Sequence, residues 1–243
     1  MFFKRVYSIF LLLVLACVTL WTIRALVGKT NSTYRHSPAD KCMQESLYVG
    51  FAIADYYEIN GCYPFSDFAS NHLISWRVLL EDHLQKGLYP IRKRDVTINK
   101  AWWTSENADA RRHTPSPFYC PCKSSIDGET SIVAVRSKRG CFSPNGNIAT
   151  DDPDDNLIFV KIANSGINWL EPRDIEESEL STVEGCHVRD GKKCITVGMA
   201  SGKVYLLTLE NFRQIYPALI DVNSGKKFVK TKDGFITTIF VCE

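Results

Sequence analysis

The sequence predicts an α+β fold in which an N-terminal membrane helix is followed by an amphipathic helix packed on an antiparallel β-sheet. Three observations predict it. An uncharged apolar segment lies near the start, a long helical pattern follows, and segments rich in β-branched and aromatic residues occupy the second half. Because the helical patterns precede the strand patterns rather than alternating with them, the class is α+β and not doubly wound α/β.

The first segment has the length of a membrane span. Val6 to Ile23 contains 18 residues without a charge, and as a helix it would rise about 27 Å, close to the hydrocarbon thickness of a bilayer. Lys4 and Arg5 precede it, which favours a cytoplasmic N-terminus and an extracytoplasmic remainder. A cleaved signal peptide is the alternative, but the segment is long for one and no small-x-small site follows. The sequence therefore predicts a single-pass membrane anchor over residues 1–28.

A linker over residues 29–39 leads into a predicted extracytoplasmic domain over residues 40–243. The domain begins with a helix of about 22 residues, since Ser37 can cap it, Pro38 suits its first position and Asn60-Gly61 ends it. Its apolar stripe consists of Val49, Ala52, Ile53, Tyr56 and Tyr57. Such a stripe favours core packing over a ligand surface. A shorter helix is predicted from Ser75 to Gly87.

The second half of the chain has strand patterns. The expected strands are Thr130 to Val135, Asn156 to Ala163, Cys194 to Met199 and Lys203 to Leu209. Gly202 indicates a hairpin between the last two, and Asp233-Gly234 indicates another within residues 227–242. The long segment from Lys100 to Lys123 contains three prolines and is expected to be irregular, anchored by Trp102, Trp103 and a cysteine pair.

Nine cysteines are an unusual number for a chain of 243 residues. One, Cys17, lies in the predicted anchor. The other eight are Cys42, Cys62, Cys120, Cys122, Cys141, Cys186, Cys194 and Cys242. An even set behind a membrane anchor indicates disulfides in an oxidising compartment, with a pairing that sequence cannot assign. Zinc binding is the alternative, but the Cys120-Pro121-Cys122 spacing is tighter than usual, and Cys186, His187 and Cys194 would have to be brought to it by the fold.

Composition and motifs argue against several functions. The net charge is +2 and no long basic stripe is present, so no nucleic-acid partner is expected. No nucleophile elbow, metalloprotease motif or phosphate loop occurs, so neither a catalytic residue nor a cofactor site is predicted. Cys186 and His187 are neighbours, but adjacent strand residues point to opposite faces, which disfavours a catalytic pair. No metal ligand set is predicted.

The segment "WLEPRD", from Trp169 to Asp174, follows a predicted strand with an indole and a charged cluster. Pro172 lacks a backbone donor and is expected to end the strand or take it out of the sheet. Trp169 can bury its ring there. Glu171, Arg173 and Asp174 can pair with one another or with loop amides. We interpret the segment as a structural corner, with a partner-binding lip and a catalytic corner as alternatives.

Several of these segments together resemble one family, the bacterial pseudopilin-like domain of unknown function 1559, of type II secretion G-like proteins. The similar segments are "CMQESLYVGFAIADYYEINGCYP" from Cys42, "SWRVLL" from Ser75, "WTSEN" from Trp103, "FYCPC" from Phe118 and "WLEPRD" from Trp169. They keep the family's order from about Cys42 to Leu207. The resemblance implies a type IV pilin-like plan, with a membrane helix leading into a helix that lies against an antiparallel sheet.

The chain departs from that family at two places. The family's Gly-Phe-Thr-Leu-x-Glu processing motif is missing at the membrane segment, which argues against peptidase processing and filament assembly. The family's C-terminal His-x9-Asp-Gly becomes His187, thirteen residues, then Ser201-Gly202. The resemblance implies a structural or binding role in the cell envelope without catalysis, with other pseudopilin-like or envelope proteins as candidate partners. It also implies that the anchor lies in the cell inner membrane and that the rest of the chain is periplasmic. The alternatives are an accessory subunit of a secretion or pilus-like assembly and an envelope hydrolase.

Overall fold

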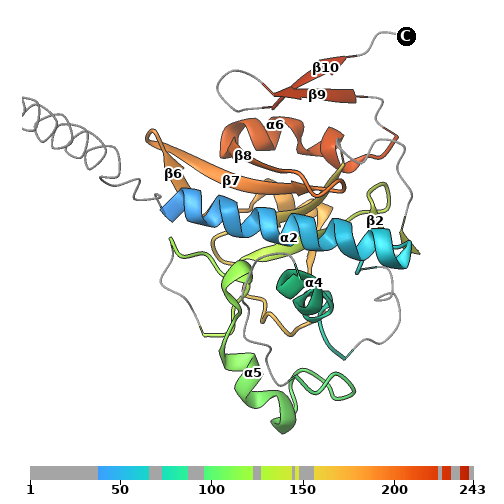
Figure 1. Ribbon diagram of the computed structural model, residues 1–243. Coiled ribbons are helices and arrows are strands. Elements are labelled where there is room, and N and C mark those ends of the chain that lie inside the picture. Colours follow the sequence, from blue (N-terminus) through green and yellow to red (C-terminus); the bar gives the residue numbers. More distant parts are fainter. Residues whose placement is uncertain are drawn as a thin grey trace, which may run out of the picture. The chain divides into compact units, whose positions relative to one another are not determined.

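The structure is α+β, with a mainly antiparallel sheet that carries helices on both faces (Figure 1). The computed structural model describes residues 38–65, 73–86, 96–122, 127–143, 146–147, 156–223, 226–230 and 236–240. These residues belong to one compact unit, Pro38–Glu243. The predicted anchor, Val6 to Ile23, lies outside the described residues, and no described helix is long and apolar enough to cross a membrane.

The main sheet contains the four predicted strands and two short ones. Its members are β1 (Ile132–Arg136), β4 (Leu157–Lys161), β5 (Ile175–Glu176), β6 (His187–Arg189), β7 (Lys192–Met199) and β8 (Val204–Thr208). β7 is the central strand. β8 pairs with one edge of β7, and β4 and β6 pair with different halves of the other edge. The strand order is β5-β1-β4-β7-β6, with β8 beside β7. All these pairs are antiparallel except β1 with β5.

The predicted long helix covers one face of this sheet. It is α2 (Pro38–Asn60), and it packs on β7 and β8 with Val49, Ala52 and Ile53 buried. The second predicted helix is interrupted at Leu80 into α3 (Trp76–Leu79) and α4 (Glu81–Lys86). Ser75 caps it as expected, because its hydroxyl accepts the amide hydrogen of Arg77. The apolar core on this face includes Ile132 and Ala134 of β1.

The opposite face is covered by a helix that the sequence analysis did not predict. This helix, α6 (Leu209–Ile220), follows β8 directly, and the hydroxyl of Thr208 caps it by accepting the amide hydrogen of Asn211. Its apolar residues pack with Val133 and Val135 of β1. Since Ile132 and Ala134 face α2 while Val133 and Val135 face α6, both faces of the sheet are buried, as the alternation along a strand requires.

The remaining elements are short. They are η2 (Ser105–Asn107), α5 (Ala108–Arg112), η3 (Ser116–Phe118), η5 (Glu177–Ser181), and two separate hairpins, β2 (Phe142–Ser143) with β3 (Gly146–Asn147) and β9 (Lys226–Lys230) with β10 (Ile236–Phe240). The segment expected to be irregular therefore contains three helical turns, one of which includes Pro117. Trp102 is half-buried, but Trp103 is 60% exposed, so the expectation that Trp103 anchors this segment is wrong.

Close approach of two backbones fixes how α2 lies on the sheet. A Cβ on Gly50 of α2 would lie 2.3 Å from the carbonyl oxygen of Gly202, in the turn between β7 and β8. Gly202 has a φ of 83°, in the left-handed region that favours glycine. Gly202 is therefore required by backbone geometry and by contact with α2.

We expect Gly50→Ala to destabilise the domain by about 1–3 kcal/mol, because the added methyl group forces α2 away from the turn. Alanine in place of a glycine inside a helix ordinarily stabilises a protein by about 0.5–1 kcal/mol, so a destabilised variant would indicate the close contact with the turn. Chemical unfolding followed by tryptophan fluorescence would measure the change. Glu58→Ala, on the exposed end of α2, is the control and should have little effect. A stabilised Gly50→Ala variant would contradict the packing.

Candidate functional site

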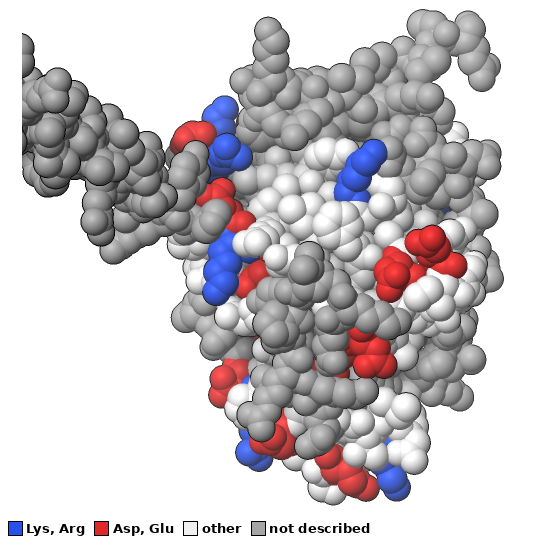
Figure 2. Space-filling view, in the orientation of Figure 1, with Lys and Arg blue, Asp and Glu red and all other residues white. Residues whose placement is uncertain are grey.

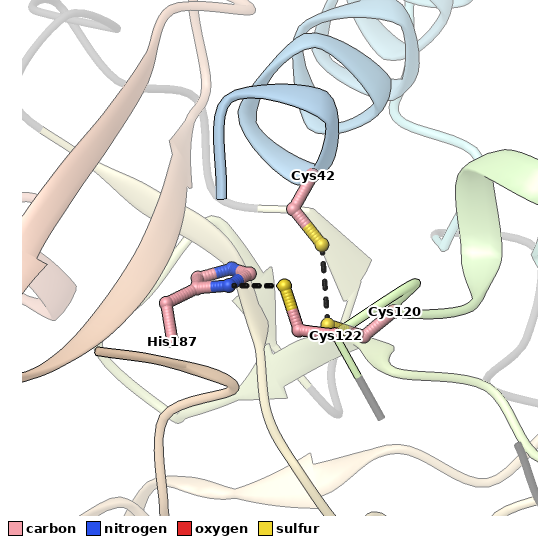
Figure 3. Close-up of side chains that lie close together, drawn as sticks. All are labelled: Cys42, Cys120, Cys122 and His187. Carbon is pink, nitrogen blue, oxygen red and sulfur yellow. Dashed lines mark hydrogen bonds between the residues drawn. The ribbon is translucent and has the colours of Figure 1, made fainter. Parts of the chain in front are cut away.

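Three thiols and one imidazole converge at one end of the sheet. They belong to Cys42, Cys120, Cys122 and His187, and their ligand atoms all lie within 4.8 Å of one another. The Sγ atoms of Cys42 and Cys120 are 3.1 Å apart, and the Sγ of Cys122 lies 3.2 Å from Nδ1 of His187. Figure 3 shows the four side chains pointing toward a common centre from three separate parts of the fold.

Each of these side chains is held by a different local structure. Cys42 lies in the first turns of α2, and Cys120 and Cys122 flank Pro121 in the turn after η3. His187 begins β6, whose hairpin to β7 pairs it with Cys194. Cys42, Cys120 and His187 are buried, whereas Cys122 is exposed. The cluster is therefore almost closed, with Cys122 on its solvent side.

A buried ion pair lies beside the cluster. The Nζ of Lys161, on β4, is 3.6 Å from a carboxylate oxygen of Glu45, on α2, and both side chains are inaccessible to solvent or nearly so. The other oxygen of Glu45 accepts the hydroxyl hydrogen of Ser116. The charge of Lys161 opposes the rise in the pKa values of Cys42 and Cys122 and adds to the lowering of the pKa of Cys120. The wall of the site thus contains a positive charge that is paired with Glu45.

The thiols are not equivalent as acids. Contacts with the thiols of Cys186 and Cys42 lower the pKa of Cys120, while the same contacts raise the pKa values of its two neighbours. Burial raises the pKa of Cys122 to about 11 and lowers the pKa of His187. Both shifts favour the neutral thiol of Cys122 and the neutral imidazole of His187 over a thiolate–imidazolium pair.

The structure brings together some of the candidate cysteines and not others. All seven that it describes are free thiols, and Cys242 lies outside the described residues. Cys42, Cys120, Cys122 and Cys186 are at or beside the cluster, whereas Cys62, Cys141 and Cys194 contribute no ligand atom to it. Burial raises the pKa of Cys141 to about 12. The disulfide pairing therefore stays a prediction.

The tetrad was not predicted from the sequence. The metal ligands weighed there were Cys120, Cys122, Cys186, His187 and Cys194, but not Cys42, which lies 78 positions before Cys120. No local spacing connects these two residues. The thiol of Cys186 also contacts the thiol of Cys120, although Cys186 was expected to point to the opposite face from His187. Cys186 lies just before β6, so the alternation of side chains along a strand does not apply to it.

The other sequence-predicted site, the "WLEPRD" segment, lies elsewhere. Asp174 is buried, and one of its carboxylate oxygens accepts from the guanidinium of Arg77 at 2.5 Å and from the amide of Ala134 at 2.8 Å. The other oxygen accepts from Nε1 of Trp76 at 2.8 Å. Burial raises the pKa of Asp174 and lowers that of Arg77, and the two charges oppose these shifts in each other. Because three N–H groups donate to its two oxygens, Asp174 is a carboxylate.

The rest of this segment holds the corner in place. Trp169 is fully buried, and its Nε1 donates to the carbonyl of Ala110 at 2.8 Å. Arg173 pairs with Glu171 at 2.8 Å on the surface. Pro172 does not end the preceding strand, as the sequence analysis expected, because β4 stops at Lys161 and the segment instead leads into β5. Asp174 pairs with Arg77 rather than with the charges beside it.

Comparisons with protein-family models, with curated proteins and with solved structures found no match for this chain. The chemistry open to the thiol–imidazole cluster follows from its four side chains. Three thiols and an imidazole can bind a soft metal ion, and two thiols in contact can form a disulfide. The Arg77–Asp174 network is closed to solvent, and its donors and acceptors are used within the protein.

Proposed function

We propose that the protein is a membrane-anchored, extracytoplasmic pseudopilin-like protein with a structural or binding role in the bacterial cell envelope. The observation that carries the proposal is the placement of α2 along the antiparallel sheet, downstream of the apolar segment Val6 to Ile23 and its polar linker. A membrane segment that leads into a helix docked on a sheet is the plan that the family resemblance implies. In this proposal the segment Val6 to Ile23 anchors the domain to the membrane.

Two segments that carry the resemblance also support the proposal by their contacts. The "SWR" segment supplies Trp76 and Arg77, and the "WLEPRD" segment supplies Asp174, which binds both. The backbone joins them again where the amide of Ser75 donates to the carbonyl of Leu170 at 2.9 Å. Trp76, Arg77 and Asp174 thus hold α3 to the sheet, which is a structural role.

Membrane attachment has a direct test. We expect the full chain to remain in the membrane pellet after an alkaline wash, and a variant lacking residues 2–28 to be released. Leu12→Lys with Val14→Lys should weaken insertion, because each lysine near the centre of a span costs about 2.5–3.5 kcal/mol. Cell fractionation with immunoblotting would measure the distribution, and protease added to spheroplasts should digest the domain.

The control is a pair of lysines at exposed positions of the domain, Glu58→Lys with Asn60→Lys, which should leave the distribution unchanged. A full-length chain that washes off the membrane would contradict the anchor. A chain that stays in the membrane but resists protease in spheroplasts would contradict the periplasmic orientation.

A second candidate is an accessory subunit of a secretion or pilus-like assembly. It is favoured by exposed apolar residues on α2, where Phe51 is 63% and Ile59 is 59% accessible. Figure 2 shows wide uncharged surface on this face, with acidic and basic side chains of the described residues interspersed around it. The missing processing motif counts against the candidate. Cross-linking in membranes decides it, since a Phe51→Glu variant should lose a pilin-like partner if one binds through α2.

A further inference from the structure

We propose that Cys42, Cys120, Cys122 and His187 form a structural binding site for one soft metal ion of the Zn²⁺ class. The inference does not depend on the proposed function, since a metal site would tie together the domain wherever the chain resides. Three thiolates and one imidazole are a common ligand set of structural zinc sites. Four protein ligands leave no open position, so the site would be structural rather than catalytic.

The geometry fits a tetrahedral ion. With Zn–S bonds of about 2.3 Å, sulfur atoms bound to one tetrahedral zinc lie about 3.8 Å apart. The Sγ atoms of Cys42 and Cys120 are 3.1 Å apart and all four ligand atoms lie within 4.8 Å of one another, so the cluster has the dimensions of such a site. Small rotations of the side chains would place the four atoms around a common centre. The Pro121 turn brings both of its thiols to one side, which accommodates the tight spacing.

A disulfide explains less of the arrangement. The Sγ atoms of Cys42 and Cys120 are 3.1 Å apart, well beyond the bonded distance of about 2.05 Å. A bond between them would use two thiols and leave Cys122 beside a buried imidazole. The Nε2 of His187 has no hydrogen-bond partner among the described residues, so the ring's polar contact within the cluster is the thiol of Cys122. A ligand that engages all four groups accounts for the convergence.

The surroundings suit such an ion in charge and access. Three thiolates and a dication carry one net negative charge, and the ammonium of Lys161, which also pairs with Glu45, lies within the same buried region. Cys122 is exposed, which gives the ion a path into the cluster. A bound ion would join the start of α2, the turn after η3 and the β6–β7 hairpin, three parts that are distant in sequence.

The test uses the full chain in mild detergent, reduced and without oxygen, with Co²⁺ as the spectroscopic probe. We expect one Co²⁺ per chain, with the thiolate charge-transfer bands and intense visible bands of a tetrahedral site, and displacement of Co²⁺ by Zn²⁺. Cys122→Ser should weaken binding at least about tenfold, the loss that removal of even an outer-shell partner produces. Cys122→His should keep tetrahedral binding with weaker charge-transfer bands.

The matched controls are Cys62→Ser and Cys194→Ser, which remove a thiol outside the tetrad and should leave the spectrum unchanged. Circular dichroism checks that each variant is folded. If wild-type protein gives no tetrahedral thiolate spectrum, or if Cys122→Ser binds Co²⁺ as wild type does, the proposal is wrong. It is equally overturned if thiol alkylation in intact cells, followed by peptide mapping, finds Cys42 and Cys120 joined by a disulfide. None of these results depends on whether the anchor is present.

Discussion

Replacing Asp174 with alanine should lower the free energy of unfolding by about 3–5 kcal/mol, because it leaves the guanidinium of Arg77 buried without its counter-charge. Both side chains are almost inaccessible to solvent, so water cannot replace the lost partner. The substitution also removes the acceptor for Nε1 of Trp76 and for the amide of Ala134. A domain of ordinary stability, about 5–15 kcal/mol, would lose a large share of it.

Urea unfolding followed by tryptophan fluorescence would measure this change, with Arg173→Ala as the matched control. Arg173 is adjacent in sequence and belongs to the same motif, but it is exposed and pairs on the surface, so its loss should cost about 0–1 kcal/mol. Equal destabilisation by the two variants would contradict the assignment of the corner's stability to the buried pair.

A double replacement separates the ion pair from its packing. Arg77→Met with Asp174→Leu removes both charges, and apolar replacement of a buried pair is often neutral or stabilising. We expect the double variant to be more stable than Asp174→Ala alone. A double variant less stable than either single one would instead indicate that the hydrogen bonds of Arg77 to Ser75 and Ile132 contribute more than the charges do.

Replacing Trp169 with alanine should destabilise the domain by about 3–5 kcal/mol, the usual range for deletion of a large buried aromatic side chain. Trp169 is fully buried, and its ring packs in a small apolar cluster with Ile74, Ala110 and Leu170. The substitution would also leave the carbonyl oxygen of Ala110 without the hydrogen bond that it accepts from the indole. Thermal unfolding monitored by circular dichroism would record the loss.

The control for this experiment is Trp103→Ala. Trp103 is 60% exposed, so this substitution removes a ring of the same size from the surface. Its effect should stay within about 0.5 kcal/mol. Trp169→Phe keeps the apolar ring and loses the indole donor, so it should fall between wild type and Trp169→Ala. A Trp169→Ala variant as stable as Trp103→Ala would show that the corner contributes little to the fold.

The helices and strands were largely predictable from the sequence, because the signals that specify each one lie in neighbouring residues. Pro38 and Asn60 bound α2 as the cap and stop signals predicted, and Ser75 caps α3. The four expected strands all form, since β-branched runs specify strands when both faces can be buried. The helix α6 was missed although Thr208 caps it and Phe212, Ile215 and Leu219 have helical spacing.

The sequence by itself determined the α+β class, the order of the main elements, the apolar segment at the start and the identity of the corner as a distinct feature. The tertiary structure alone decided which distant groups meet. It joins Arg77 to Asp174 and Cys42 to Cys120, partners 97 and 78 positions apart. The physical reason is that local patterns fix helices and strands through nearby backbone and packing preferences, whereas a buried charge or thiol acquires its partner only when the sheet and its helices pack.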